Sequence, residues 1–299
     1  VGRSPAIGMT FCRRLFVAAL LGAAVLAGCS GLEAQQRKWI FRATPAAAAS
    51  VEELAGFAHG LGMEDAWIAL ESKVAGRPIR LHGLWAENDD ARAPLLLYLH
   101  GARRNVAGSV WRIEQMRALG FSVLAIDYRG FGNSTDAPPS EKAALEDAQA
   151  AWAWLGQRRP GHDRYVLGYS LGGAVAVQLA VLQGASKASA PAGVILESTF
   201  TSMHDMFRSL RWGWLPITAL ITERFDSLGQ IGQVSAPLLV VHGSADAFVP
   251  PRFGRALYEQ AGAVKKRFLL VEGGTHFSTY GRGLEQYRGA LREMFGVGT

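Results

Sequence analysis

Gly168-Tyr169-Ser170-Leu171-Gly172 lies between two segments of different periodicity. Residues 164–167 form a strand-like run, and residues 172–182 continue as an apolar helical pattern. A G-x-S-x-G sequence between a strand and a helix is typical of a nucleophile elbow, where small neighbours allow a strained serine and a close approach of strand and helix. The same residues would also suit a tight turn in which Ser170 caps the helix. The pentapeptide alone therefore leaves catalysis open.

Two later segments contain the partners that a serine nucleophile needs. A serine hydroxyl is a weak nucleophile on its own, so it requires a base, and the base requires an acid that orients it. Asp246 follows the buried-strand run 237–241, and His276 follows the strand-like run 266–271. Each candidate thus lies where a predicted parallel strand ends, which is the edge at which open α/β sheets place their sites.

Glu197 is the alternative to Asp246 as the orienting acid, because it ends the strand-like run 194–196. We favour Asp246. Among the seven histidines, His276 alone lies in a glycine-rich loop between a late strand and a terminal helix, whereas His242 is interpreted as an interior or loop residue. The sequence contains no H-x-x-x-H pattern and no paired cysteine spacing, so it predicts no metal site and no cofactor.

Further motifs extend this order along the chain. Residues 95–102, LLLYLHGA, are similar to the oxyanion strand and loop of the α/β-hydrolase superfamily, and residues 121–134, FSVLAIDYRGFGNS, are similar to its next strand and D-x-R-G-x-G-x-S turn. With the elbow and the later Asp and His, they make residues from about 64 to 296 resemble the serine hydrolases of this superfamily, in particular its small lipase- and aminopeptidase-like members. The resemblance implies that Ser170 is the nucleophile, His276 the base and Asp246 the orienting acid.

The resemblance also implies an oxyanion hole made of two backbone N–H groups. One belongs to Leu171, the residue after the nucleophile. The other comes from the loop after His100 and Gly101, with Ala102 as the simplest donor and Arg103 as the alternative. His100 itself is expected to be a scaffold residue.

The order of the predicted elements indicates the fold class. Segments 67–70 and 79–85 are expected to form an antiparallel start to the sheet, and strands alternate with helices from residue 95 onward. This alternation predicts an α/β protein with a mostly parallel, doubly wound sheet, in agreement with the α/β-hydrolase fold that the resemblance implies. No Pro/Ser-rich linker interrupts the motifs, so residues 51–299 are predicted to form one domain. Helices are expected at residues 109–119, 141–157, 171–183, 251–261 and 284–294.

The connection at about residues 199–234 is predicted to be a short helical cap. It is long for a connection and rich in aromatic residues, and insertions at this place cover the site in the family that the chain resembles. Phe207, Trp212 and Trp214 are the candidates for lining an acyl pocket. The alternative is a crossover helix packed on the sheet, in which these side chains would belong to the core.

Residues 1–28 have the pattern of a signal peptide. Arg13 and Arg14 precede an apolar stretch that is too short to span a bilayer comfortably. Its ending, LAGC at residues 26–29, resembles a bacterial lipobox, in which Cys29 is lipidated. An ordinary secretory signal and a signal anchor are the alternatives, and Met9 is a candidate start. Residues 29–50 are then expected to be a lipidated N-terminus and tether.

Lipidation at Cys29 would anchor the protein to a membrane of the bacterial cell envelope. Ser30 follows the cysteine where, by resemblance, an aspartate would retain a lipoprotein in the inner membrane, so the periplasmic face of the outer membrane is expected. Residues 1–28 contain three arginines and no acidic residue, and their removal lowers the formal net charge from +6 to +3. So small a charge, without a long basic run, argues against a nucleic acid as partner.

The sequence therefore predicts a serine hydrolase that cleaves a carboxylic ester or thioester of a small-molecule or lipid-like acyl substrate through an acyl-Ser170 intermediate. Peptide or amide cleavage by the same residues is the alternative within enzymes. A catalytically idle envelope lipoprotein that uses the fold for binding is the alternative of another class.

Overall fold

The structure, a computed structural model, describes residues 31–43, 49–210, 213–215 and 218–297. The predicted signal peptide, the lipidation candidate Cys29 and the pocket candidate Trp212 lie outside the described residues.

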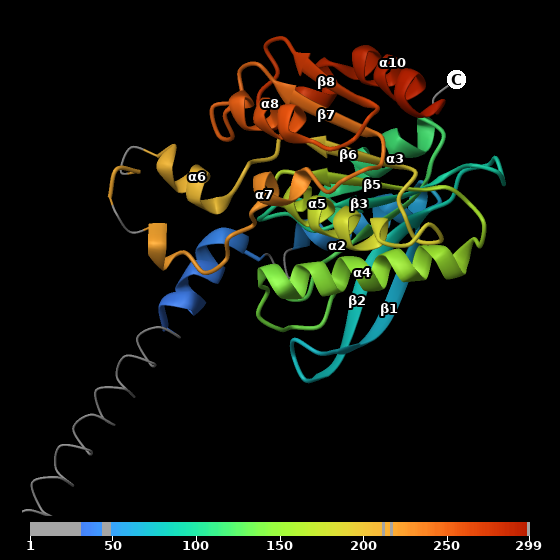
Figure 1. Ribbon diagram of the computed structural model, residues 1–299. Helices are drawn as coiled ribbons and strands as arrows, with labels where there is room; N and C mark the ends of the chain where they lie inside the picture. Colours follow the sequence, from blue (N-terminus) through green and yellow to red (C-terminus); the bar gives the residue numbers. More distant parts are fainter. Residues whose placement is uncertain (1–30, 44–48, 211–212, 216–217, 298–299) are drawn as a thin grey trace, which may run out of the picture.

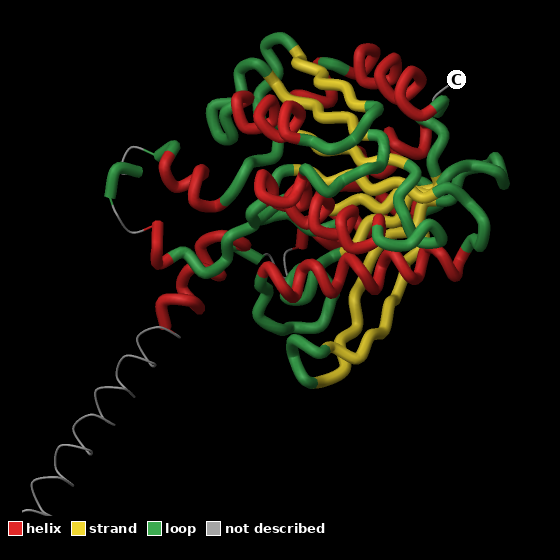
Figure 2. The backbone as a smooth tube through the Cα atoms, in the orientation of Figure 1, coloured by secondary structure: helices red, strands yellow, loops and turns green. Residues whose placement is uncertain are grey.

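An eight-stranded sheet forms the centre of the molecule (Figures 1 and 2). The spatial order of the strands is β1-β2-β4-β3-β5-β6-β7-β8. β2 pairs antiparallel with both β1 and β4, and every pairing from β4 to β8 is parallel. The predicted antiparallel start and the mostly parallel sheet are therefore confirmed. The strands are β1 (Glu64–Ser72), β2 (Arg77–Ala86), β3 (Leu95–Leu99), β4 (Ser122–Ile126), β5 (Arg164–Tyr169), β6 (Gly193–Glu197), β7 (Leu238–Gly243) and β8 (Lys266–Val271).

Helices cover both faces of this sheet, as a doubly wound fold requires (Figure 2). The side chains of β3 alternate between two buried clusters: Leu95, Leu97 and Leu99 pack in one, and Leu96 and Tyr98 pack in the other. The first cluster includes residues of α4 (Glu141–Arg158), α5 (Leu171–Gly184), α7 (Ser227–Ile231) and α8 (Pro251–Gln260), and the second includes residues of α3 (Val110–Ala118) and α10 (Leu284–Phe295). Both sides of each central strand are buried, which explains their continuous apolar runs.

The predicted helices 109–119, 141–157, 171–183, 251–261 and 284–294 correspond to α3, α4, α5, α8 and α10 within a few residues. Short helical pieces lie at η1 (Ala107–Ser109) and α9 (Thr279–Arg282). The connection at 199–234 contains α6 (Met203–Arg208), η2 (Thr218–Leu220) and α7, with α6 standing out at the left edge of the molecule in Figure 1. This connection is short and helical, and we refer to residues 199–234 as the cap region; that it covers the site stays a prediction.

The chain before the sheet differs from the expectation of a tether over residues 29–50. Residues 31–41 are helical and α2 (Ala49–Gly60) follows them. The Phe41 side chain is fully buried in the same cluster as α4 and α5. Residues 31–43 therefore pack on the domain.

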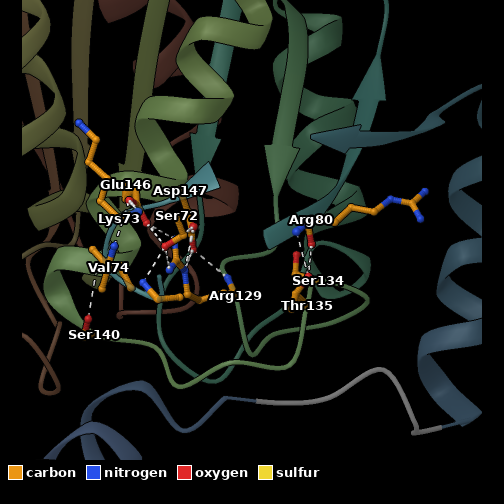
Figure 3. Close-up of polar contacts among 12 residues, drawn as sticks. Ser72, Lys73, Val74, Arg80, Arg129, Ser134, Thr135, Ser140, Glu146 and Asp147 are labelled. Atoms are coloured by element: carbon orange, nitrogen blue, oxygen red, sulfur yellow. Dashed lines mark hydrogen bonds and ion pairs between the residues drawn. The ribbon is translucent and has the colours of Figure 1, made fainter. Parts of the chain in front are cut away.

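A closed cluster of charges lies beside the turn that follows β4 (Figure 3). Buried Arg129 donates from Nη2 to Asp147 at 2.6 Å and to Glu146 at 2.6 Å, and from Nη1 to the Ser72 hydroxyl at 2.8 Å. Burial would lower the pKa of Arg129, but its bonds to Asp147 and Glu146 outweigh burial and raise that pKa. The cluster joins the end of β1, the turn after β4 and α4, so it holds three parts of the scaffold together.

Candidate active site

Ser170 occupies the sharp turn between β5 and α5. Its backbone has φ 53° and ψ −117°, a strained conformation for a residue with a side chain. A Cβ on Gly168 would lie 2.3 Å from the Gly172 carbonyl oxygen, and one on Gly172 would lie 2.1 Å from the Leu99 carbonyl oxygen. Only glycine fits at these two positions, so the spacing of the G-x-S-x-G sequence has a direct steric cause.

The structure brings Ser170, His276 and Asp246 together. His276 Nε2 lies 3.2 Å from Ser170 Oγ, and His276 Nδ1 lies 2.8 Å from Asp246 Oδ2. The three residues come from the loops after β5, β7 and β8, at the carboxyl edge of the parallel strands. All three are buried, with relative exposures of 8% for Ser170, 5% for His276 and 3% for Asp246. This geometry could carry a proton from the serine hydroxyl to a carboxylate-oriented imidazole.

Asp246 is held as an ionised acceptor. Its Oδ1 accepts from the backbone N–H groups of Phe248 at 3.0 Å and Val249 at 2.8 Å. His242, fully buried, donates from Nε2 to the Val249 carbonyl at 2.8 Å and lies 3.4 Å from Asp246 Oδ2. Burial would raise the pKa of Asp246, but hydrogen bonds with His242, His276 and Val249 outweigh it and hold that pKa below its ordinary value. The prediction that His242 is an interior residue is confirmed.

Aromatic rings surround the imidazole of His276. The Tyr169 hydroxyl donates to the His276 carbonyl at 2.9 Å, and the Phe248 and Phe277 rings lie 5.0 and 5.1 Å from the imidazole, between ring centroids. Phe277 is 73% exposed, so this side of the imidazole borders the surface. Sequence reasoning did not single out these three aromatic residues, although two of them adjoin candidate residues in the chain.

The loop after β3 passes directly beside the serine. A Cβ on Gly101 would lie 3.1 Å from Ser170 Cβ, so the glycine allows this approach. The N–H of Arg103 donates to the carbonyl of Phe41 at 3.0 Å. Among the described residues, the N–H groups of Ala102 and Leu171 have no hydrogen-bond acceptor. Of the two candidates in this loop, Ala102 therefore has the available donor.

Glu197, the alternative to Asp246 as the orienting acid, lies beside Ser170 but, within the described residues, forms no hydrogen bond with His276. Its carbonyl accepts from the Ser170 N–H at 2.9 Å, and its carboxylate forms an ion pair with Arg112 of α3. The Arg112 guanidinium stacks 3.8 Å from the centroid of the Tyr280 ring. His276 is hydrogen-bonded to Asp246, so the geometry favours Asp246 over Glu197 as the orienting acid.

Two of the three cap candidates, Phe207 and Trp214, lie in the described part of the chain. Phe207 is half-buried on α6, and Trp214 is 74% exposed. Within the described part of the chain, no ring or polar contact joins either side chain to Ser170 or His276. A shallow depression lined by residues such as Arg92, His162 and Phe295 lies at the amino ends of β3 and β5, opposite the serine. In that same described part, no group of three or more His, Cys, Asp or Glu side chains could hold a metal ion.

Residues 90–228 match the family described as serine aminopeptidase, S33. The match includes Ser170 and the loop after β3 but ends before Asp246 and His276. The chain is 38% identical over 164 residues to an uncharacterized protein of Mycobacterium tuberculosis, covering 54% of this chain and 55% of that protein. It is 32% identical over 186 residues to the lysophosphatidylserine lipase ABHD12 of Danio rerio, covering 58% of this chain and 48% of the lipase. The chain thus spans about half the length of the curated relatives that it matches.

Among solved structures, the fold is similar to that of the Pyrococcus furiosus esterase Pf2001. The TM-score is 0.64 at 19% identity, and the likeness covers 80% of this chain and 92% of the esterase. At that identity the likeness concerns the fold.

Proposed function

Because this chain has the α/β-hydrolase fold, we propose that it is a serine hydrolase that cleaves carboxylic esters or thioesters through an acyl-Ser170 intermediate. The observation that carries the proposal is the continuous set of contacts from Ser170 Oγ through His276 to Asp246. The match to a serine hydrolase family and the likeness to a lipase and an esterase support the same class of reaction.

In the proposed mechanism, His276 Nε2 takes the proton of the Ser170 hydroxyl as Oγ attacks the substrate carbonyl carbon. Asp246 holds Nδ1 and stabilises the imidazolium that forms. The N–H groups of Leu171 and Ala102 receive the oxyanion of the tetrahedral intermediate. His276 then protonates the leaving alcohol or thiol, which departs and leaves the acyl-serine. A water molecule, deprotonated by His276, attacks the acyl carbon, and the carboxylic acid is released as Ser170 regains its proton.

The proposed substrate is a small or lipid-like acyl ester. The ABHD12 relative is a lysophosphatidylserine lipase, and this activity supports ester cleavage over peptide cleavage. Peptide or amide hydrolysis by the same residues is the second candidate, which the serine aminopeptidase match supports. The three converging side chains weigh against a catalytically idle binding protein, since binding alone does not require a base positioned on a serine hydroxyl.

The test is active-site labelling with a fluorophosphonate combined with hydrolysis of a short p-nitrophenyl ester. We expect one label at Ser170. Ser170→Ala should take up no label, and its turnover should be lower by a factor of about 10⁴ or more. Ser209→Ala is the matched control, because its hydroxyl donates to the Met206 carbonyl of the cap region and forms no other hydrogen bond with a described residue. Equal turnover in Ser170→Ala and the wild type would refute the assignment. Turnover of a p-nitroanilide peptide that exceeds ester turnover would favour the second candidate.

The cap side chains Phe207 and Trp214, with Trp212, remain the proposed acyl contacts. The exposure of Trp214 supports a surface role, because an exposed indole contributes little to core packing. We expect Trp214→Ala to change the preference for acyl-chain length while shifting the melting temperature little. An unchanged preference across esters of two to twelve acyl carbons, about the range of common chromogenic esters, would contradict this role.

The lipid anchor at Cys29 and the location at the periplasmic face of the outer membrane are proposals from the sequence. No helix of the described residues is long and apolar enough to cross a membrane. Two acyl chains on Cys29, each stabilised by about 0.8 kcal/mol per buried CH₂, would suffice for stable membrane residence. Intact-mass analysis of the native protein, with Cys29→Ser as control, tests the anchor. An unlipidated N-terminus in the wild type would refute it without affecting the hydrolase proposal.

A further inference from the structure

The helix of residues 31–41 is attached to the cap region by polar contacts. Gln36 donates from Nε2 to the Leu220 carbonyl at 2.7 Å and accepts at Oε1 from the Thr222 N–H at 3.0 Å. Arg37 donates from Nε to the carboxylate of Glu223 at 2.7 Å. In Figure 1 this helix, in blue, lies beside the orange segment that contains η2. The helix is therefore fixed along the cap region, 180 or more residues later in the chain.

Buried Glu223 extends this attachment into the scaffold. Its second carboxylate oxygen accepts from the N–H of Glu141 at 2.5 Å, at the first turn of α4. A carboxylate at a helix N-terminus satisfies an N–H group that has no partner within the helix. The 31–41 helix is thus linked through Arg37 and Glu223 to the longest helix on that face of the sheet.

Phe41, at the end of the same helix, packs between the cap region and the turn after β4. Its fully buried ring lies 5.9 Å from the Phe225 ring of the cap region and 6.4 Å from the Phe131 ring of the turn after β4, between centroids. The Phe131 ring in turn lies 5.1 Å from the ring of His100. Phe41 therefore packs against the ring of Phe131, which in turn contacts His100 at the start of the loop after β3.

The backbone of Phe41 contacts that loop directly. Its carbonyl accepts from the N–H of Arg103, a residue with φ 65°, in the left-handed region that side chains disfavour. On the other side of Ala102, the Gly101 carbonyl accepts from His100 Nδ1 at 2.7 Å. A trans peptide points its N–H opposite to its C=O, so the bond to Gly101 orients the Ala102 N–H away from His100. The two peptides flanking Ala102 are therefore each held by one bond.

We propose that Phe41 is a positioning residue for the oxyanion hole. It holds the Arg103 peptide through its carbonyl, and its buried ring fixes that carbonyl in place. This inference rests on the proposed function, in which the Ala102 N–H binds the oxyanion. A misplaced donor weakens binding of the transition state more than binding of the substrate, so loss of Phe41 should lower kcat and leave KM little changed.

The kinetic test compares Phe41→Leu and Phe41→Ala with Phe121→Leu and Phe121→Ala. Phe121 is also fully buried, but it packs with Tyr165 in the cluster on the other face of the sheet. We expect kcat for a short p-nitrophenyl ester to fall about tenfold or more in the Phe41 variants, with KM within about threefold. Affinity for a trifluoromethyl ketone, whose adduct carries an oxyanion, should fall by the same factor as kcat. The Phe121 variants should lose melting temperature but keep kcat within about threefold. Unchanged kcat in Phe41→Ala, or an equal loss in both series at equal stability, would overturn the proposal.

Hydrogen exchange of backbone amides gives a second measurement that does not require activity. The Arg103 N–H should be protected in the wild type and exchange faster in Phe41→Ala, while Phe121→Ala should leave it protected. An unprotected Arg103 amide in the wild type would refute the positioning role even if the protein is an active hydrolase. A wild type that neither labels nor hydrolyses esters would instead refute the proposed function, and the exchange result would then still decide whether Phe41 holds the loop.

Discussion

Two carboxylate clusters in this protein, one around Arg129 and one around Asp246, differ in the groups that their hydrogen bonds connect. Around Arg129, the carboxylates of Asp147 and Glu146 meet the several donors of one guanidinium, and the Ser72 hydroxyl completes the set (Figure 3). Asp246 is equally well bonded, but its contacts continue through His276 to the hydroxyl of Ser170, a strained residue. All polar partners in the Arg129 cluster belong to scaffold elements. The contacts of Asp246 instead lead to the Ser170 hydroxyl, a group that can lose a proton. Burial of a carboxylate therefore serves stability in one place and, by our proposal, chemistry in the other.

Asp246→Asn is expected to have the largest effect. The amide would hold the imidazole in the wrong tautomer, so turnover should fall about 10⁴-fold while the fold is retained. Glu197→Gln is the matched comparison, since Glu197 is also a buried acid at the end of a neighbouring strand but pairs with Arg112. We expect less than about a tenfold loss there. Steady-state kinetics with circular dichroism measures both, and the reverse ranking would transfer the orienting role to Glu197.

Arg129→Met should disrupt the Arg129 cluster. In contrast to Asp246→Asn, it should lower stability and leave turnover nearly unchanged. Removing one partner of a buried ion pair leaves uncompensated charge, so we expect the free energy of unfolding to fall by about 3–5 kcal/mol. Turnover per folded molecule should remain near that of the wild type. Urea denaturation and kinetics on the soluble fraction measure these quantities.

Arg92→Met is the control for that change, because the Arg92 side chain is 92% exposed and its pair with Asp90 lies at the surface. We expect an effect below about 1 kcal/mol for it. Similar stability losses in Arg92→Met and Arg129→Met would contradict a scaffold role for the Arg129 cluster.

Acidification should produce the smallest effect, a change in folding stability to which both carboxylate clusters contribute. The pKa of Asp246 lies below its ordinary value of 3.8 in the folded protein, so this group stabilises the fold above pH 3.8 and that contribution is lost as the pH falls through the folded pKa. Burial raises the pKa of Glu146, but bonds from Ser72 and Arg129 lower it overall, so it contributes in the same direction.

The measurement is the urea midpoint of the wild type and of Asp246→Asn from about pH 6 to about pH 3. The stability difference between the two proteins should narrow as the pH falls, because the wild type loses the Asp246 contribution and the variant has none to lose. A constant difference over this range would show that the carboxylate of Asp246 has the same pKa in the folded and unfolded protein.

Much of the sheet could be predicted because its signals are local. Alternating strand and helix patterns from residue 95 onward correspond to β3 to β8 and their helices within a few residues. Side-chain periodicity depends on neighbours a few residues away, and those neighbours are adjacent in the sequence. The helices over residues 31–41 and 49–60 were missed, because the alanine-rich stretch before residue 50 resembles a tether when nothing indicates a surface to pack on.

The approach of Ser170, Asp246 and His276 also followed from local signals. Each lies in the loop that follows a predicted parallel strand, and the carboxyl ends of such strands meet at one edge of the sheet. The choices between candidates required the tertiary structure. Asp246 is favoured over Glu197 because Arg112 reaches the latter from α3, 85 residues earlier in the chain.

Ala102 is favoured over Arg103 because a carbonyl at residue 41 takes the Arg103 N–H. The amino-acid sequence determined which residues can turn, alternate and bear reactive groups, since backbone sterics and side-chain chemistry act over short distances along the chain. The partner of each polar group was decided only by the fold, because packing the 31–41 helix and α3 against the sheet brings together donors and acceptors that no local pattern relates.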